Sequence, residues 1–376
     1  MRIPFNRPTL VGGELDLLRE VIESGRLSGD GVFTRKCQAL FEEVLGVEKA
    51  LLTTSCTQAL ELACLLLELG PGDEVILPSF TFVSTANAFA LRGVKPVFCD
   101  IDPNDLNLDP AHAAKLITPR TRALVPVHYG GVGCDMDRLG ALADAHGLEI
   151  VEDNAHGLFG AYKGRPLGTI GALATLSFHD TKNFTSGEGG VLLINDPKLV
   201  PRAEILWHKG TDRSRFFRGE IDKYTWVDLG SSYTPSEFTA AFLYRQLEAR
   251  EEVQGAREKV WRRYRTELST WAGRQGVALP PAPEERLPAY HLFFLVMPTP
   301  EAQTGLIAHL RERGIQSVFH YQPLHSSTMG QRLGGKPGDC PVTERVSASL
   351  VRLPFFTGLS QSDQGEVIEA VTAFEC

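Results

Sequence analysis

Between residues 50 and 200, short apolar runs alternate with helical stretches, and this pattern constrains the fold more than any other feature of the chain. Residues 57–69 form a predicted helix that is apolar nearly all round, so we expect it to be buried. The alternation indicates βαβ units, in which helices cover both faces of a mostly parallel sheet. Ligands of such sheets bind at the carboxyl ends of the strands, where we therefore expect the chemistry. Strands are predicted in EVILP, VKPVFCDI, RALVPVHY, LEIVEDNA, ATLSFHD and GGVLLIND.

A second unit is predicted towards the C-terminus. A long charged helix begins near residue 235, and a proline-rich break follows at 279–288. After the break we expect a strand in HLFFLVM, a helix in EAQTGLIAHLRERG, a strand in IQSVFHY and two further helices. The chain is therefore predicted to be an α/β protein with a large domain at 1–240 and a small C-terminal α+β domain at 241–376.

Composition argues against several classes of protein. The 38 Lys and Arg residues and 46 Asp and Glu residues give a net charge of −8, which argues against a general nucleic-acid binder. No run of about 20 apolar residues is present, so we expect no membrane span. The seven cysteines are odd in number and include no CxxC pair, which disfavours a zinc knuckle or a disulfide framework. We also find no signal-peptide pattern, and these features together favour a cytoplasmic location.

Three short segments carry candidate chemistry. One apolar run ends in Glu152 and Asp153, although the alternative for Asp153 is a helix cap. Lys182 lies in a polar turn between two predicted strands, and lysine forms Schiff bases with carbonyl cofactors. Taken alone, a lysine in such a turn is more often a surface lysine. The third segment, TTSCTQ, precedes a helix whose N-terminus attracts phosphate, although Ser55 or Thr57 can also serve as a plain N-cap.

The combination of these segments indicates one cofactor, pyridoxal 5′-phosphate (PLP). PLP carries a phosphate, a pyridine nitrogen and an aldehyde. It requires an anion site, a carboxylate that keeps the nitrogen protonated, and an amine for the Schiff base. The chain supplies TTSCTQ, Asp153 and Lys182 in that order. We therefore predict a PLP enzyme.

Longer motifs extend this interpretation over nearly the whole chain: SCTQALELA, PGDEVILPSFTFVSTANAF, VHYGG, VEDNAH, GTIGALATLSFHDTKN, GEGG and FHYQPLH. On these motifs the chain resembles the DegT/DnrJ family of sugar-nucleotide aminotransferases, within the aspartate aminotransferase-like class of PLP fold type I. The segments FRGEIDKYTWVDLGSSY and SFHDTKNFTSGEGG are most similar to the branch that makes dTDP-4-amino-4,6-dideoxygalactose.

The resemblance implies roles for three catalytic residues. Lys182 matches the lysine that forms the Schiff base with PLP. Asp153 matches the carboxylate that stabilises the protonated ring nitrogen, so that the ring can accept electrons from the substrate. His156 occupies the position where relatives place His or Gln close to the ring.

Four further residues match cofactor contacts of the family. Phe82 matches an aromatic residue that stacks on the ring, and its alternative is an ordinary core position. The phosphate contacts match Thr57, Gln58 and Ser177. Relatives also often contribute an Asn from the partner subunit, in a segment that resembles GSSYTPSEF. No Asn occurs there, and the substitutes that the segment offers are Ser231, Ser232 and Thr234.

Candidate substrate contacts come from two segments. FHYQPLH contains His320, Tyr321 and His325, near the place where the family closes over the sugar. A metal site there lacks a third ligand, so we expect no metal. In the second segment, arginines suit the oxygens of a diphosphate, and aromatic rings suit a nucleotide base. Their alternatives are a solvated basic loop and simple packing. These residues are Arg213, Arg215, Arg218, Tyr224 and Trp226.

The resemblance implies transfer of an amino group from glutamate to a nucleotide-linked keto-sugar, at C4 of dTDP-4-keto-6-deoxyglucose. The main alternative is another nucleotide keto-sugar, aminated at C3 or linked to UDP or GDP. Related sugar dehydratases carry His in place of the lysine, so Lys182 disfavours that activity. An inactive sensor or scaffold is disfavoured because Lys182 and Asp153 are both present. A homodimer with shared active sites is also implied.

Overall fold

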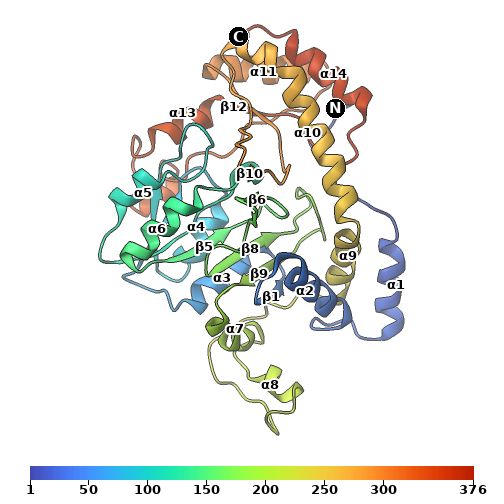
Figure 1. The fold of residues 1–376 in the computed structure, drawn as a ribbon, viewed down its shortest axis with the longest axis vertical. Coiled ribbons are helices and arrows are strands. Elements are labelled where there is room, and N and C mark those ends of the chain that lie inside the picture. The colour runs from blue at the N-terminus through green and yellow to red at the C-terminus, as the bar shows by residue number, and fades with distance from the viewer.

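The structure, a computed structural model, describes all 376 residues. A seven-stranded sheet forms its centre, with the strand order β1-β9-β8-β5-β4-β2-β3 (Figure 1). Only β9 runs antiparallel to its neighbours, so the other six strands point the same way. The predicted α/β class with a mostly parallel sheet is confirmed. The strands are β1 (Lys49–Thr53), β2 (Glu74–Pro78), β3 (Lys95–Cys99), β4 (Thr121–Leu124), β5 (Glu149–Asp153), β8 (Leu173–Ser177) and β9 (Gly190–Ile194).

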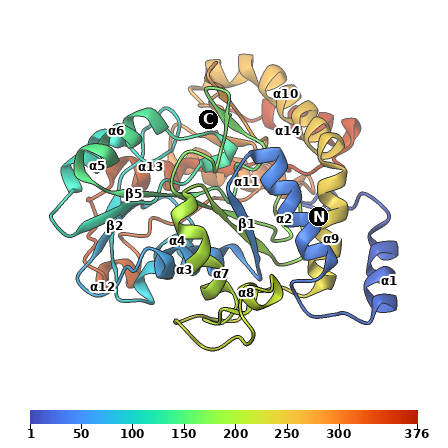
Figure 2. The same cartoon turned by 60° about the horizontal axis from the view of Figure 1, so that its bottom comes forward.

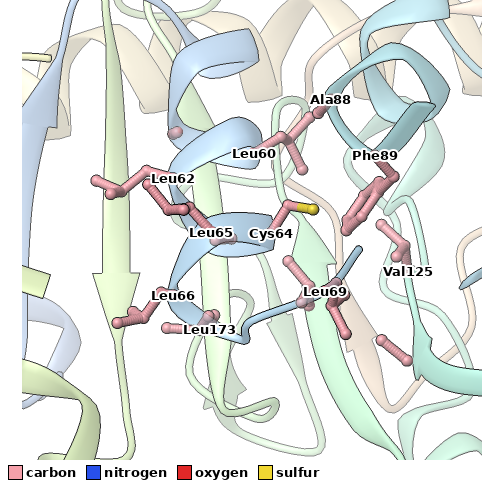
Figure 3. Packing of buried hydrophobic residues seen from close by; sticks show 14 of the residues in the cluster. Leu60, Leu62, Cys64, Leu65, Leu66, Leu69, Ala88, Phe89, Val125 and Leu173 are labelled. Carbon is pink, nitrogen blue, oxygen red and sulfur yellow. The ribbon is translucent and has the colours of Figure 1, made fainter. Parts of the chain in front are cut away.

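Helices cover both faces of this sheet. On one face, α3 (Cys56–Leu66), α4 (Val83–Ala90) and α7 (Val200–Trp207) bury a large apolar cluster (Figure 3). The predicted buried helix is confirmed, because α3 packs against α4 and α7 as well as against the strands. The other face is covered by α2 (Val32–Leu45), α5 (Pro110–Leu116), α6 (Met136–His146) and α9 (Glu237–Glu248).

The C-terminal part has its own apolar core. Trp261, Tyr264 and Phe293 lie at its centre, and Ile3 from the N-terminus joins them. The N-terminus accordingly lies beside this unit (Figure 1). No helix of the chain combines the length and the apolar character that crossing a membrane requires. The elements of this unit are α10 (Arg250–Gln275), β11 (Phe294–Val296), α11 (Pro300–Glu312), α13 (Pro341–Ser349), β12 (Leu350–Arg352) and α14 (Gln361–Thr372), whereas Leu324 and Leu333, which flank α12 (Thr328–Arg332), pack with the cluster of the large unit.

Three details differ from the sequence predictions. The single long helix predicted from residue 235 is two helices, α9 and α10, that meet at Ala249. This break lets α9 pack against α1 (Glu14–Ser24) and α2, while α10 packs against α14. The strand predicted in IQSVFHY is absent, because Ile315 and Val318 form only isolated bridges. In its place, β11 pairs with β12. The sequence did not predict the strands β12 and β1.

The chain returns to the large unit before it completes the C-terminal unit, and there it joins a separate three-stranded sheet. β10 (Arg286–Leu287) pairs with β6 (Ala161–Tyr162), which also pairs with β7 (Arg165–Pro166). We call residues 286–291 the crossing segment. The separate cores lead us to propose the domain boundary at the junction of α9 and α10, with the crossing segment as a return contact.

Candidate active site

The candidate residues gather at one edge of the sheet. Asp153 is the last residue of β5 and Ser177 is the last residue of β8, while β1 leads directly into α3. These three strands run in the same direction, so their carboxyl ends share an edge. The site therefore lies where the pattern of strands predicted it.

Asp153 is buried and has few partners within the chain. Thr85 of α4 donates a hydrogen bond to its Oδ2 at 2.8 Å, and the Ala155 N–H donates to its Oδ1 at 3.2 Å. Turns rather than a helix follow β5, so Asp153 is not a helix cap. Burial raises the pKa of this carboxyl above its usual value. A cationic group beside Asp153 would counter that effect, as a protonated pyridine nitrogen does.

Lys182 lies in the turn between β8 and β9 and is half-buried. Its ammonium group makes no hydrogen bond or ion pair within the chain. Burial lowers the pKa of Lys182 to about 8, although Cys56 and Asp153 oppose the shift. At pH 7 roughly one molecule in ten then carries a neutral amine, against about three in ten thousand for an ordinary lysine. The side chain is thus suited to act as a nucleophile and a base.

The start of α3 forms the anion site. Ser55 caps the helix by accepting the Gln58 N–H at 3.2 Å, and its carbonyl accepts the Ala59 N–H. The N–H groups of Cys56 and Thr57 are left without an acceptor in the chain. They point outward from a helix start that carries a partial positive charge, as an anion requires.

A glycine allows this helix start to approach the sheet. A Cβ at Gly190 would lie 2.4 Å from the Cys56 nitrogen, which no side chain can occupy. Gly190 is also the register partner of Ser177, so the end of β8 adjoins the strand that the helix start approaches. Two further hydroxyls gather there, because Thr57 Oγ1 lies 2.7 Å from Ser84 Oγ and Thr54 donates to the Gln58 side chain. The predicted phosphate residues are therefore neighbours in space.

His156 is buried beside these groups. Its Nε2 lies 3.3 Å from the Tyr321 hydroxyl, and its Nδ1 has no partner at all. Burial, with Lys182 and Arg352 nearby, holds the pKa of His156 well below its usual value, so the ring is neutral. Its ring stacks on His291 at a centroid distance of 4.2 Å. A buried nitrogen without a partner is costly unless a ligand supplies one, which fits a polar ring bound here.

The structure places Phe82 and the pair of His320 and Tyr321 as follows. Phe82 is the N-cap residue of α4 and is 58% exposed, so the alternative of a core position is wrong. In the small unit, His320 and Tyr321 stack at 3.6 Å, and Tyr129 holds His320 Nδ1 at 2.7 Å. Tyr321 reaches the site through its contact with His156.

The structure contradicts the prediction that His325 contacts the substrate. Its side chain is fully buried, with Nδ1 at 2.6 Å from Ser79 Oγ and Nε2 at 2.9 Å from Glu344 Oε1. Both ring nitrogens are therefore used within the fold, and neither is free to contact a substrate. No group of three or more His, Cys, Asp or Glu side chains is arranged to hold a metal ion.

The arginine segment projects away from this edge. It contains α8 (Arg213–Phe217), which extends from the large unit on the side away from α11 and α14 (Figures 1 and 2). Arg218 pairs with Glu204 and Glu220, and Arg215 also pairs with Glu220. One chain by itself thus does not bring the second group of substrate candidates to Lys182: Arg213, Arg215, Arg218, Tyr224 and Trp226.

Four residues of the site were missed from the sequence: Thr85, Tyr129, Asn183 and His291. Thr85 lies within the motif PSFTFVSTANAF and Asn183 follows Lys182 directly, so both had a signal in the chain. Tyr129 is part of VHYGG. No signal in the sequence pointed to His291, because the residues that follow it were predicted only as an apolar strand.

A lysine of lowered pKa, a buried carboxylate within its electrostatic reach and an open helix start are what PLP chemistry requires. These residues fit the cofactor, and the unpartnered His156 Nδ1 and the approach permitted by Gly190 fit it independently. The fold and the site therefore define a PLP-dependent enzyme of fold type I.

Comparisons with known proteins agree. A model of the DegT/DnrJ/EryC1/StrS aminotransferase family matches residues 9–372, and the chain belongs to this family. The solved aminotransferase TlmJ from Streptoalloteichus hindustanus superposes with a TM-score of 0.90 at 35% identity, over 99% of this chain and 98% of that one. The PLP form of Spr1654 from Streptococcus pneumoniae has a TM-score of 0.90 at 26% identity, over the same shares. The predicted family and the predicted PLP cofactor are confirmed.

Two curated relatives are similar over nearly their full lengths. The spore coat polysaccharide biosynthesis protein SpsC of Bacillus subtilis (strain 168) is 34% identical, over 98% of this chain and 96% of the relative. The GDP-perosamine synthase of Caulobacter vibrioides is 33% identical, over 98% of this chain and 97% of the relative.

Proposed function

We propose that this aminotransferase moves an amino group from glutamate to C4 of dTDP-4-keto-6-deoxyglucose, giving dTDP-4-amino-4,6-dideoxygalactose. The half-buried Lys182 of low pKa, within electrostatic reach of Asp153, carries the amino-transfer part of the proposal. Relatives named for polysaccharide biosynthesis and for a GDP-linked amino-sugar support a nucleotide-sugar acceptor. The choice of dTDP and C4 rests on the segments FRGEIDKYTWVDLGSSY and SFHDTKNFTSGEGG.

The residues of the site have separate roles in this reaction. When bound, PLP supplies the electron sink for the carbon that loses a proton. Asp153, which is buried and has few hydrogen-bond partners in the chain, would hold the proton on the ring nitrogen. Lys182 would anchor the cofactor. As a free amine it would move a proton from glutamate to the cofactor in the first half-reaction and from the cofactor to the sugar carbon in the second. Thr57, Gln58 and Ser177 hold the phosphate beside the start of α3.

His320 and Tyr321 supply polar groups on the acceptor side. They come from the small unit and reach the site through His156 and Tyr129. A hydroxyl and an imidazole in this place suit the hydroxyls of a sugar ring, for which both can donate or accept.

The second candidate acceptor is a GDP-linked 4-keto-sugar. It is favoured by the 33% identity to the GDP-perosamine synthase over nearly the whole chain. The two candidates share the reaction and differ in the nucleotide, so a substrate panel distinguishes them.

We also propose a homodimer in which the segment around α8 covers the site of a second copy. The segment exposes a group of aromatic side chains that its own chain leaves uncovered: Phe216, Phe217, Tyr224 and Trp226. Arg213 Nε is buried without a partner on the same segment. In this arrangement the arginines and aromatic residues approach the nucleotide from the partner. Sedimentation that finds a fully active monomer at nanomolar concentration would contradict the dimer.

The test of the proposed function is a panel of nucleotide keto-sugars. Purified protein, PLP and glutamate are incubated with dTDP-, UDP- and GDP-linked 4-keto-6-deoxyhexoses, a 3-keto isomer and a simple keto acid. NMR then identifies the amino-sugar formed. We expect the dTDP-linked 4-keto-sugar to exceed the keto acid in kcat/KM by roughly a hundredfold or more, because of its charge-assisted diphosphate contacts. Equal use of the keto acid would refute the sugar-nucleotide acceptor, and preference for GDP would select the second candidate.

A further inference from the structure

The turn that carries Lys182 is held from outside the large sheet. Asn183, the next residue, is buried and donates from Nδ2 to the Ala289 carbonyl at 2.7 Å and to Gln254 Oε1 at 3.2 Å. Because Nδ2 donates to these two oxygens, Oδ1 of Asn183 is the acceptor of the amide. It lies 2.9 Å from Nδ1 of His291. His291 must therefore carry its proton on Nδ1 and donate it to Asn183.

His291 is also fixed on its other side. Its ring stacks on His156 at 4.2 Å with an interplanar angle of 22°. One buried side chain thus contacts both the lysine turn and the histidine next to the cofactor site. Neither contact contributes to the chemistry described above.

The crossing segment that carries His291 is itself rigid. Arg257 of α10 donates to the Tyr290 carbonyl at 2.9 Å and to the His291 carbonyl at 2.6 Å. The Ala289 N–H donates to the Gly131 carbonyl, and a Cβ at Gly131 would lie 2.9 Å from that of Ala289. Tyr290 holds a left-handed backbone with φ of 52°, which a non-glycine residue adopts only when its surroundings require it. The segment therefore gives His291 a defined place relative to α10.

We propose that His291 is a positioning residue for Lys182: its Nδ1–H fixes Asn183, and this contact sets the turn from which the lysine reaches into the site. Through Arg257, the same contact couples the placement of the small unit to the placement of the amine. The inference rests on Lys182 as the PLP-binding amine, part of the proposed function, and is independent of the sugar. Asn183→Ala removes the same contact from the other side.

The test compares two substitutions that separate the contacts of His291. His291→Asn keeps a donor at the place of Nδ1 and loses the ring, while His291→Phe keeps a stacking ring and loses the donor. His146→Asn is the matched control, because His146 is an exposed histidine on α6. Full-length protein freed of PLP is treated with acetic anhydride at a series of pH values. Mass spectrometry of the Lys182 peptide then reports the apparent pKa and the reactivity of this one amine.

In the wild-type protein we expect the Lys182 titration near 8. A loosened turn would expose the Lys182 ammonium to water. It would also move the ammonium away from Cys56, Asp153 and Arg352, the charged or titratable groups that influence its pKa. His291→Phe is therefore expected to raise the apparent pKa by about one unit or more and to increase labelling. His291→Asn and His146→Asn are expected to remain close to the wild type. In the holoenzyme, His291→Phe is expected to lower kcat about tenfold with KM for glutamate within about twofold.

A folded His291→Phe variant with the wild-type titration overturns the proposal, and so does a shift in His291→Asn as large as that in His291→Phe. If His291→Phe does not fold, Asn183→Ala decides, since an unchanged titration in that folded variant has the same meaning. Failure of the proposed function is seen separately: borohydride reduction of the holoenzyme would then attach the cofactor to a lysine other than Lys182.

Discussion

Glu152 and Asp153 are adjacent carboxylates at the end of β5, yet the two faces of the sheet use them differently. Glu152 is fully bonded: it accepts from His128 Nε2 at 2.8 Å and from the N–H groups of Gly168, Ile170 and Gly171. Asp153 accepts only from Thr85 and Ala155. Burial alone raises the pKa of both groups, but the hydrogen bonds to Glu152 outweigh burial and lower its pKa, whereas that of Asp153 stays raised.

The difference shows how the site keeps binding capacity. A buried carboxylate whose oxygens are all occupied stabilises the loops that donate to it and has nothing left for a ligand. A buried carboxylate with few donors remains able to bind a cation that arrives later. Glu152 thus belongs to the framework and Asp153 to the chemistry. The following predictions test that division, from the largest expected effect to the smallest.

The amine beside Asp153 carries the largest effect. Lys182→Ala is expected to abolish turnover and the visible absorbance of covalently bound PLP, because no other amine lies in the site. The free energy of unfolding of the PLP-free protein is expected to change by less than about 1 kcal/mol, since this ammonium has no partner. Absorbance spectra, kinetics and denaturation measure these quantities, with the exposed Lys198→Ala as control. Residual turnover in Lys182→Ala would place the amine elsewhere.

Asp153→Asn comes next. The amide cannot stabilise a protonated ring nitrogen, so we expect turnover to fall by about a hundredfold to a thousandfold. PLP is expected to remain bound through the lysine and the phosphate site. Glu152→Gln is the matched comparison, and its folded fraction is expected to keep turnover within about threefold. Equal losses in the two variants would remove the distinction between framework and chemistry.

For stability the order of the two residues is reversed. Glu152→Gln replaces one of the two acceptor oxygens with an N–H₂ group. That group faces two donors, either the N–H groups of Ile170 and Gly171 or those of Gly168 and His128, and we expect the change to destabilise the fold by roughly 2–4 kcal/mol. Urea denaturation of PLP-free protein measures this change, and Asp153→Asn serves as its control. A loss in Asp153→Asn as large as that in Glu152→Gln is the contrary result.

The smallest effect is an opposite dependence on pH. The folded pKa of Glu152 is lowered, so its contribution is present above the unfolded value of about 4.3 and is lost as the pH falls through the folded pKa. The folded pKa of Asp153 is raised, so PLP-free protein loses stability as the pH rises from about 3.9 through the folded pKa. The free energy of unfolding is measured across this acid range. We expect the dependence due to Glu152 to disappear in Glu152→Gln and the dependence due to Asp153 to disappear in Asp153→Asn. Parallel curves for both variants would contradict the assignment.

The sequence predicted the parts of the fold and site that depend on local pattern. The parallel sheet, the buried α3, the cofactor and the family follow from periodicity and from motifs such as VEDNAH and SFHDTKN. The motif VEDNAH assigned the cofactor role to Asp153 by resemblance, but periodicity alone gave no physical reason to prefer Asp153 to Glu152. That distinction depends on donors from Gly168–Gly171 and from α4, which meet the strand end only after folding.

The wrong predictions have the same origin. His325 has the sequence context of a substrate-binding loop, but Ser79 and Glu344 reach it from elsewhere and occupy both nitrogens. The helix break at Ala249 was missed because the charged pattern continues across it. The break arises because α9 and α10 pack into two separate cores. The role inferred for His291 depends on Asn183, which lies 108 residues earlier in the chain. Local patterns carry no information on such contacts.

The pairing of β1 with β9 also bears on how the protein is made. β1 is the first strand of the seven-stranded sheet in chain order, yet its only neighbour in that sheet is the last one, β9, more than 130 residues later. The start of α3 meets Gly190, the first residue of β9, so the phosphate site cannot be complete on a shorter nascent chain. We therefore expect PLP to be captured only by chains that extend through β9, so that PLP binding would report that the two ends of the sheet-forming region have met.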